Sequence, residues 1–330
     1  MKNLRKISIL FLMLILLAST TMTGCGKKSS IGDKVILYTN ADDEAVTAMK
    51  NALDNNGYKD KYILQTFGTS ELGGKIVAEG KNIEADLITM SSFYIDSAEN
   101  QHHMFKNLEF DTGAIDKYPE YYTPITAQEG SIIYNTEAVK QNNLEIPKSI
   151  KDLTKPEYKD LVSVTDVNSS STAWLLIQAM ISEYNEDGTK DILKKIYKNA
   201  GSHIEQSGSG PIKKVRAGEV AVGFGLRHQA VRDKGQGLPI GYVDPTEGNF
   251  TLTESVAVID KGNKSNQEAM KMAECIIKNG RQELLKTYPI ALYNGENVSQ
   301  DNKSGNPKVF KEALTVDLLK KHQQLSEDCK

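Results

Sequence analysis

Residues 34–53 read KVILYTNADDEAVTAMKNAL, a short β-prone run followed by a stretch with helical spacing. Ala45, Met49 and Leu53 recur on one face of the expected helix, and an Asn or Asp just before it can cap its start. The alternation continues, with strands predicted over 62–67 and 85–90 and a helix after the turn at 68–72. This order is typical of βαβ units in a mostly parallel sheet.

A second alternating block follows the first. Strands are predicted over 131–135, 160–164, 221–225 and 255–259, and helices over 173–181 and 267–277. The chain is long enough for two domains, and 39% hydrophobic residues fit a folded protein. No linker separates the two blocks, so we expect the chain to cross between two α/β domains more than once.

The N-terminus has the layout of an export signal. A basic start precedes an apolar run over 7–18, which is too short to span a bilayer comfortably. Gly24 and Cys25 resemble a bacterial lipobox, although Met22 stands where Leu is usual. We therefore expect residues 1–24 to be a signal peptide and Cys25 to carry a lipid. Residues 25–32 would be a tether on the outer face of the cell membrane. The alternative is an ordinary cleaved signal with a chance cysteine.

Several classes of protein are not indicated. The chain has 40 basic and 43 acidic residues, and no basic cluster alternates with aromatic side chains, so nucleic-acid binding is not expected. No nucleophile elbow, phosphate loop or Cys/His metal spacing occurs, so we expect no enzyme, cofactor or metal site. Cys275 and Cys329 lie far apart and are open to either a disulfide or free thiols.

Hydroxyl and glycine residues recur where predicted strands give way to helices. The four junctions are 39–40, 68–70, 169–172 and 207–211. In α/β sheets such junctions lie at the ligand-binding edge, and a helix start offers unpaired N–H groups to an anion. Each junction taken alone is also explained as a simple N-cap. Together they favour an anion site that needs no formal positive charge.

Two charged residues extend this set. Arg227 follows a predicted strand that contains two glycines, and its planar guanidinium suits phosphate or phosphonate oxygens, although a surface ion pair is the alternative. Glu254 precedes the last core strand and is placed to meet an amine. The predicted ligand-binding residues are Thr39, Asn40, Thr69, Ser70, Ser91, Ser169, Ser170, Ser171, Thr172, Ser207, Gly208, Ser209, Arg227 and Glu254.

Residues 150–160, IKDLTKPEYKD, resemble the W-x-DL-x-P-x-YKGK segment of type 2 periplasmic solute-binding proteins, with Ile150 where many have Trp. The same family is matched in order and spacing by 37–40, 68–72, 168–173, 207–211 and 215–219. The resemblance implies two domains, a ligand cleft between them, hinge closure and delivery to an ABC permease. It places domain 1 at 33–128 plus 254–290, and domain 2 at 129–253 plus 291–330.

The chain is most similar to the branch that contains ferric-ion, phosphonate and sugar-phosphate binders. Ferric-ion binders place adjacent tyrosines where this chain has Arg227 and His228, and Arg would repel the metal. The resemblance therefore implies a small anionic ligand, either an organophosphonate such as 2-aminoethylphosphonate or a phosphate ester. The alternatives are a ferric-ion receptor, an enzyme acting on a phosphorylated molecule, and a sensor subunit. A receptor that opens and closes is expected to be a monomer.

Overall fold

A computed structural model describes residues 34–330; the predicted leader and the whole predicted tether, including Cys25, lie outside the described residues. The strands are β1 (Val35–Thr39), β2 (Tyr62–Thr66), β3 (Leu87–Ser91), β4 (Thr123–Asn135), β5 (Val162–Thr165), β6 (Ile204–Glu205), β7 (Val222–Leu226), β8 (Ile240–Val243) and β9 (Thr251–Val258). Within residues 34–330, no helix combines the length and the apolar character needed to cross a membrane.

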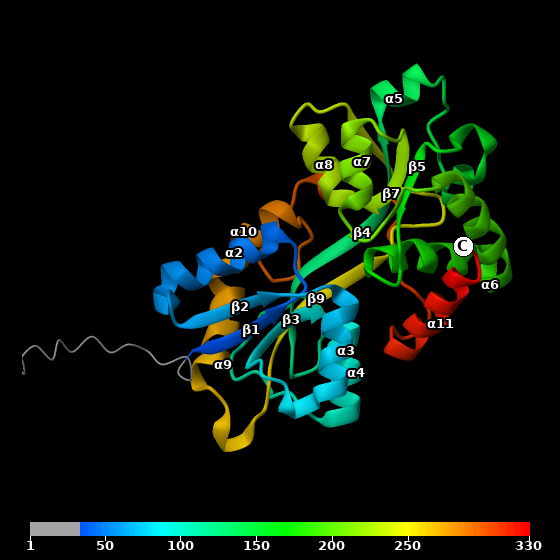
Figure 1. Ribbon diagram of the computed structural model, residues 1–330. Coiled ribbons are helices and arrows are strands. Elements are labelled where there is room, and N and C mark those ends of the chain that lie inside the picture. The colour runs from blue at the N-terminus through cyan, green and yellow to red at the C-terminus, as the bar shows by residue number, and fades with distance from the viewer. Residues whose placement is uncertain (1–33) are drawn as a thin grey trace, which may run out of the picture. The chain divides into compact units, whose positions relative to one another are not determined.

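Helices alternate with these strands for most of the chain, which confirms the α/β fold predicted from the sequence (Figure 1). They are α2 (Asp43–Leu53), α3 (Thr69–Glu79), α4 (Ser92–His102), α5 (Thr136–Gln141), α6 (Thr172–Ala200), α7 (Gly210–Ala217), α8 (Arg227–Gly235), α9 (Gln267–Cys275), α10 (Arg281–Thr287) and α11 (Val316–Glu327). The helix predicted to end at residue 181 runs to Ala200, with a break at Asn185, where φ is 58°.

The strands pair in the order β2-β1-β3-β9-β4-β7-β5-β6, with β8 attached to β4. Parallel pairs join β1 to β2 and β3, and β5 to β6 and β7. Every antiparallel pair involves β4 or β9. The parallel pairs therefore lie in two separate groups, and the two antiparallel strands connect them.

Strand β4 changes partners along its length. Residues 123–129 pair with β9, and residues 130–134 pair with β7. We call β1–β3 with helices α2–α4, α9 and α10 the first half, and β5–β8 with helices α5–α8 the second half. Strands β4 and β9 run side by side from one half to the other (Figure 1). The domain boundaries expected from the sequence stay a prediction.

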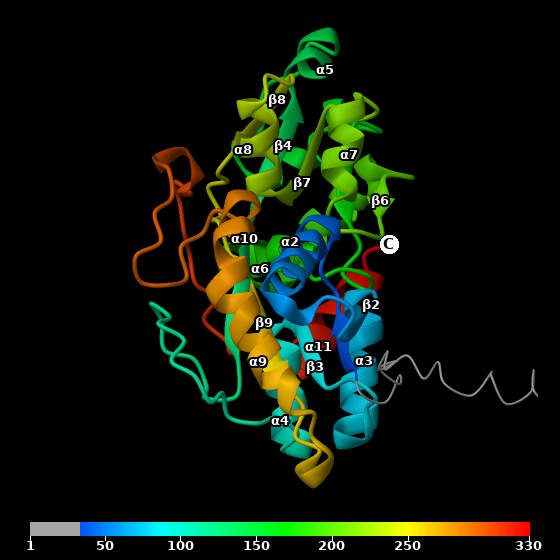
Figure 2. The same cartoon turned by 90° about the vertical axis from the view of Figure 1, so that its left-hand side faces the viewer.

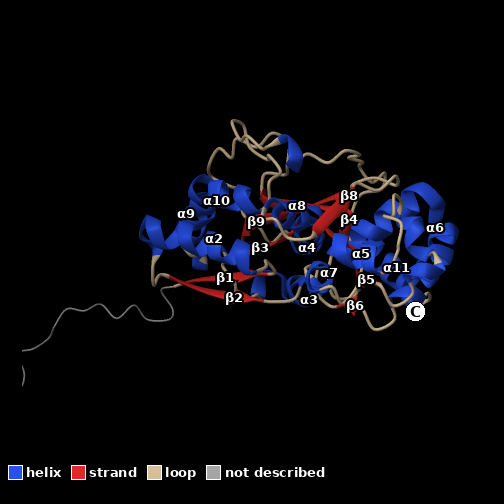
Figure 3. Ribbon diagram, turned by 90° about the horizontal axis from the view of Figure 1, so that it is seen from above, coloured by secondary structure: helices blue, strands red, loops and turns tan. Residues whose placement is uncertain are grey.

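Three apolar clusters hold the described chain together. One lies between the strands of the first half and helices α2, α9 and α10. Figure 2 shows α10 continuing on from α9, with α2 beside them. A smaller one packs α7 and α8 on β4. The largest continues from α3 and α4 to α6 and α11, so both halves contribute side chains to it. Helices thus cover both faces of the strands (Figure 3).

The segment after α10 contacts both halves. Leu292 and Tyr293 are buried in the core of the first half, whereas the Asp301 and Lys303 carbonyls accept hydrogen bonds from Arg227 of the second half. Helix α11 then packs on α6 and α4. Cys275 and Cys329 are both buried, free thiols.

Candidate functional site

A cavity of about 250 Å³ is lined by residues from both halves. Its walls come from the turn after β1, from strands β3, β4 and β9, and from the starts of α3, α6 and α7. The lining residues are Asn40, Ala41, Asp42, Ala45, Phe67, Gly68, Thr69, Thr89, Ile125, Thr126, Gln128, Ser169, Ser170, Ser171, Thr172, Gln206, Ser207, Gly208, Ser209, Leu226, Glu254 and Tyr288.

Three helix starts without side-chain caps meet at this cavity. The N-cap residues of α3, α6 and α7 are Gly68, Ser171 and Ser209, and none of them makes a side-chain capping hydrogen bond. The partial positive charge of each helix start is therefore available to a ligand. In α6 the N–H groups of Thr172, Ala173 and Trp174 already donate to Ser170 or Ser171, so this helix offers its charge and its neighbouring hydroxyl groups more than free N–H groups. Side chains do cap four other helices: Asp42 in α2, Asn135 in α5, Asn266 in α9 and Thr315 in α11.

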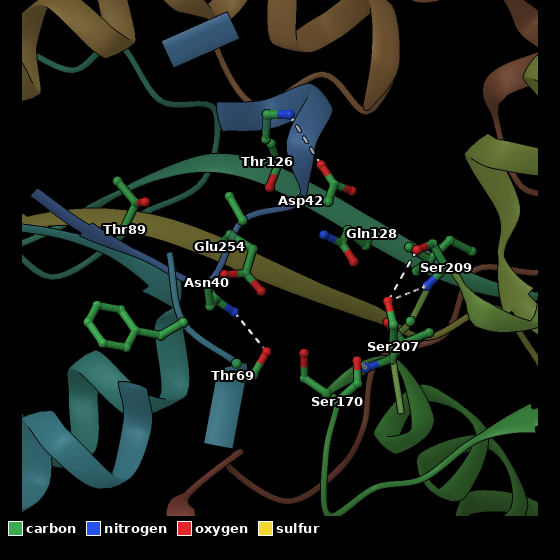
Figure 4. Close-up of a pocket in the computed structure, with 18 of the residues that line it drawn as sticks. Asn40, Asp42, Thr69, Thr89, Thr126, Gln128, Ser170, Ser207, Ser209 and Glu254 are labelled. Carbon is green, nitrogen blue, oxygen red and sulfur yellow. Dashed lines mark hydrogen bonds between the residues drawn. The ribbon is translucent and has the colours of Figure 1, made fainter. Parts of the chain in front are cut away.

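Small residues let these helix starts approach one another. A Cβ atom added to Gly208 would lie 2.1 Å from Thr172 Oγ1, so the loop before α7 contacts the start of α6 closely. Ser70 Oγ donates to the Asn168 carbonyl over 2.7 Å, which joins the start of α3 to the loop before α6. Figure 4 shows Ser170, Ser207 and Ser209 together on one side of the cavity.

A buried carboxyl group stands on the opposite side. Glu254 on β9 is 7% exposed, and its Oε1 accepts a hydrogen bond from Ser91 Oγ at 2.8 Å. Its Oε2 has no partner among the described residues. Burial raises the pKa of Glu254 from 4.5 to about 7, and the neighbouring Ser91 and Asn40 side chains offset part of that rise. The group is thus poised between its neutral and charged forms near neutral pH.

Asn40 lies beside Glu254 (Figure 4). Its Nδ2 donates to Thr69 Oγ1 at 3.0 Å, and its Oδ1 is buried without a partner in residues 34–330. The position of Asn40 follows from the end of β1, where Asn40 N donates to the Thr89 carbonyl. Two hydrogen-bond acceptors, Asn40 Oδ1 and Glu254 Oε2, are therefore left free on one wall.

Asp42 adds a second carboxyl to this wall, and it also caps α2 through a 3.1 Å bond from Ala45 N. Burial raises the pKa of Asp42, while the hydrogen bonds from Tyr288 and Ala45 act in the opposite direction. Burial, together with the Asp42 carboxyl, raises the pKa of the Tyr288 phenol far above its usual value. Tyr288 therefore stays protonated and donates its hydroxyl to Asp42.

The model of one protein family matches residues 63–309, which is more than half of the chain. That family is described as bacterial extracellular solute-binding protein. The chain belongs to this family. It is therefore a solute-binding protein of an ABC importer and not an enzyme.

Curated relatives of this solute-binding protein differ in their ligands. An uncharacterized protein of Haemophilus influenzae is 30% identical over 151 residues, covering 46% of this chain but only 43% of that protein. The Fe(3+)-binding periplasmic protein of Serratia marcescens is 26% identical over 293 residues, 82% of each chain. The spermidine/putrescine-binding periplasmic protein of Escherichia coli is 25% identical over 240 residues, 66% of each chain.

Solved structures support the same fold. The periplasmic binding protein AfuA from Actinobacillus pleuropneumoniae, with fructose-6-phosphate bound, has a TM-score of 0.71 at 20% identity, covering 89% of this chain and 97% of that chain. Iron-bound HitA from Pseudomonas aeruginosa has a TM-score of 0.72 at 18% identity, and the match covers 90% of this chain and 99% of that chain. At these identities the likeness shows the fold alone.

Most residues that the sequence predicted for the ligand site of the solute-binding protein line one cavity. They are Asn40, Thr69, Ser169, Ser170, Ser171, Thr172, Ser207, Gly208, Ser209 and Glu254. Three others support the wall from behind. Thr39 is fully buried and accepts a hydrogen bond from Thr89, Ser91 donates to Glu254, and Ser70 donates to Asn168.

The structure does not bring Arg227 to the cavity. Its side chain is 5% exposed, and its Nε donates to Asp244 Oδ1 at 2.7 Å. Its terminal nitrogens donate to the carbonyls of Asp301 and Lys303. The guanidinium of Arg227 thus binds the Asp244 carboxylate and two carbonyls of the C-terminal segment. The prediction that Arg227 contacts the ligand is therefore corrected. No Lys, Arg or His occurs among the residues that line the cavity in the described part of the chain.

Six polar lining residues were not predicted: Asp42, Thr89, Thr126, Gln128, Gln206 and Tyr288. The sequence marked Asp42 only as a helix cap, and nothing around Tyr288 indicates that it packs beside a residue 246 positions earlier. Thr126 could have been found from the pairing of β4 with β9, which sets it opposite Glu254.

Proposed function

We propose that this solute-binding protein captures a small organophosphonate or phosphate ester for import, 2-aminoethylphosphonate being the model ligand. The observation that carries the proposal is the meeting of three helix starts, α3, α6 and α7, without side-chain caps at one cavity. A phosphonate group has three oxygens that accept hydrogen bonds from such N–H groups and from Ser or Thr hydroxyls.

The size of the cavity supports a small solute. At about 250 Å³ it is slightly below the usual range of roughly 300–1,000 Å³ for ligand pockets. A phosphonate with a short carbon chain suits this space better than a bulky phosphate ester. Sequestering such a ligand between two halves fits the hinge closure expected of the fold.

Ferric iron is disfavoured by the chemistry of the lining residues. Fe³⁺ requires several anionic oxygen ligands, and among residues 34–330 no group of three His, Cys, Asp or Glu is placed to hold a metal. Tyr288 is the only tyrosine that lines the cavity in the described chain, and its raised pKa opposes the phenolate form. The similarity to iron-binding relatives therefore does not extend to a matching set of ligands here.

A polyamine is the second candidate. Asp42 and Glu254 are acidic, and the lining contains no basic residue among those described. The relative from Escherichia coli is named for spermidine and putrescine. A polyamine would use the acidic wall but would leave the uncapped helix starts without a partner, so we rank it below an anionic ligand.

Titration calorimetry on the purified protein tests the proposal. We expect 2-aminoethylphosphonate or a small phosphate ester to bind, and Ser170→Ala to weaken binding by about 10- to 100-fold through loss of a hydrogen bond to a charged group. Ser182→Ala makes the same chemical change on the exposed face of α6 and should leave the affinity unchanged. Binding of Fe³⁺ or putrescine, with no response to any phosphonate or phosphate ester, would refute the proposal.

We further propose that Cys25 carries a lipid that anchors the protein to the outer face of the cell membrane. The support is the Gly-Cys cleavage sequence and the polar tether after it. Radiolabelled palmitate fed to cells should label the wild type and not Cys25→Ser. Label on both proteins, or on neither, would argue for an ordinary cleaved signal.

A further inference from the structure

The acidic wall of the cavity presents two acceptors that nothing in the described chain satisfies. In each residue one polar atom is already committed: Asn40 Nδ2 to Thr69, and Glu254 Oε1 to Ser91. The other atom, Asn40 Oδ1 or Glu254 Oε2, is buried and free. Because unpaired buried acceptors cost free energy, native structures rarely keep them unless a ligand or a proton completes the site.

The charge of this wall selects the kind of group that fits. Glu254 interacts with Asp42, and Asp42 is the only other charged residue in the lining among those described. Tyr288 faces both carboxyls as a protonated phenol. His228 packs on Tyr288 with a ring-centroid distance of 4.8 Å, and burial lowers its pKa to about 3, so it is neutral. A positive charge must therefore come from the ligand.

The geometry points to an ammonium subsite: we infer that the solute carries a primary amine as well as its phosphonate or phosphate, and that Asn40 and Glu254 bind that amine. This inference rests on the proposed function, since the uncapped helix starts on the opposite side hold the anionic end. A primary ammonium has three N–H donors and no acceptor. Two of the donors match Asn40 Oδ1 and Glu254 Oε2, and the third faces the Asp42 side of the wall.

Without ligand, a proton on Glu254 removes the buried negative charge that the ammonium would otherwise neutralise. The neutral carboxyl avoids the cost of a buried charge, and Asn40 is close enough to act on its ionisation. When the ammonium binds, its positive charge stabilises the carboxylate, and the carboxyl proton leaves to solvent. Binding of the amine-bearing ligand is therefore coupled to proton release near pH 7.

A matched ligand pair tests the subsite. Propylphosphonate has a methyl group where 2-aminoethylphosphonate has its ammonium, so the two differ in charge and donors but little in size. We expect the wild type to bind 2-aminoethylphosphonate about 10- to 100-fold more tightly, the range given by hydrogen bonds to charged groups. Glu254→Gln should remove most of that preference, whereas Glu129→Gln, a β4 carboxyl outside the lining, should keep it.

Proton release supplies a second readout that needs no variant. Calorimetry at pH 7 in buffers of different ionisation enthalpy should show net proton release with 2-aminoethylphosphonate and none with propylphosphonate. Equal affinity of the two phosphonates for the wild type would overturn the ammonium subsite and leave the oxyanion site intact. Failure of both phosphonates to bind, with or without putrescine binding, would overturn the oxyanion site and this inference together.

Discussion

Glu254 and Arg227 show how the surroundings of a charged residue decide its role. Both are nearly buried, at 7% and 4% exposure. Arg227 forms an ion pair with Asp244, and its other N–H groups donate to two backbone carbonyls, so it has no free donor for a ligand. Glu254 has one hydrogen bond and an unpartnered oxygen that faces a cavity. A buried charge with partners supports the fold, and one without partners is available to a ligand.

Glu254→Gln should change how stability depends on pH. The folded-state pKa of Glu254, about 7, exceeds the usual glutamate pKa of 4.5, so the folded state binds more protons between these pH values and stability falls as pH rises. The cost above pH 7 is about 3 kcal/mol. The difference in unfolding free energy between Glu254→Gln and the wild type, both without ligand, should therefore favour the variant more at pH 8 than at pH 5. Urea unfolding at the two pH values measures this, and an identical difference at both would contradict it.

Arg227→Ala should destabilise the protein and leave the affinity for its ligand unchanged. The substitution leaves the Asp244 carboxylate partly buried without its cation, which costs about 3 kcal/mol. Arg232→Ala removes a partly exposed pair with Glu44 and a 3.8 Å contact with Asp233, which keeps its pair with Arg216, so it should cost less than about 1 kcal/mol. Chemical unfolding and calorimetry on the folded variants separate the two effects. Loss of binding with normal stability would restore Arg227 as a ligand contact.

At the scale of elements, the site is made of helix starts and crossing strands. The loop before α7 contacts the start of α6 closely because Gly208 has no Cβ, and α7 then begins with Pro211 in its first turn. Strand β9 sets Glu254 opposite Thr126 of β4. The anionic end of a ligand would thus be held by helix starts, and the cationic end by β9 and the turn after β1.

Gly208→Ala should weaken ligand binding by at least about tenfold, since an added Cβ forces the starts of α6 and α7 apart. Gly74→Ala is the matched control. Gly74 lies within α3, and an added Cβ there meets no atom within 4 Å, so we expect normal affinity and a gain of about 0.5–1 kcal/mol. Calorimetry and thermal unfolding of both variants check this. Equal affinities would show that the helix starts do not set the site.

At the scale of the whole molecule, the C-terminal segment joins the two halves. It contacts the first half at Tyr293, the second half at Arg227, and then forms α11 over α6 and α4. Trp174, the chain's single tryptophan, is fully buried and donates to His322 Nδ1 of α11 at 2.8 Å. The last helix therefore completes the largest core.

Ending the chain after Leu314 should expose Trp174 and lower the melting temperature by roughly 10 °C or more, because several buried apolar side chains lose their partner helix. The tryptophan emission should move to longer wavelength. Lys320→Ala, on the exposed face of α11, should change neither property. An unchanged emission maximum in the truncated protein would show that α11 does not shield Trp174.

Much of the fold and part of the site follow from local pattern. The order of strands and helices could be predicted because the spacing of apolar residues at β1, α2 or β3 indicates which face is buried. Part of the site could be predicted because the ends of parallel strands meet at one edge of the sheet. Asn40, Thr69, Ser170 and Ser209 were predicted for that reason, and they line the same cavity. Boundaries were less readable. The strand predicted over 131–135 is the second part of β4, whose first part contains a proline and pairs with β9.

The sequence by itself determined the α/β alternation and the Ser- and Gly-rich helix starts, since both depend on residues close together in the chain. Only the tertiary structure decided that Asp244 takes up Arg227, that Tyr288 packs beside Asp42, and that Glu254 keeps a free oxygen. These outcomes depend on contacts between residues far apart in the chain. Local periodicity carries no information about which distant partner a buried charge will meet, and that partner decides whether the charge is free to bind a solute.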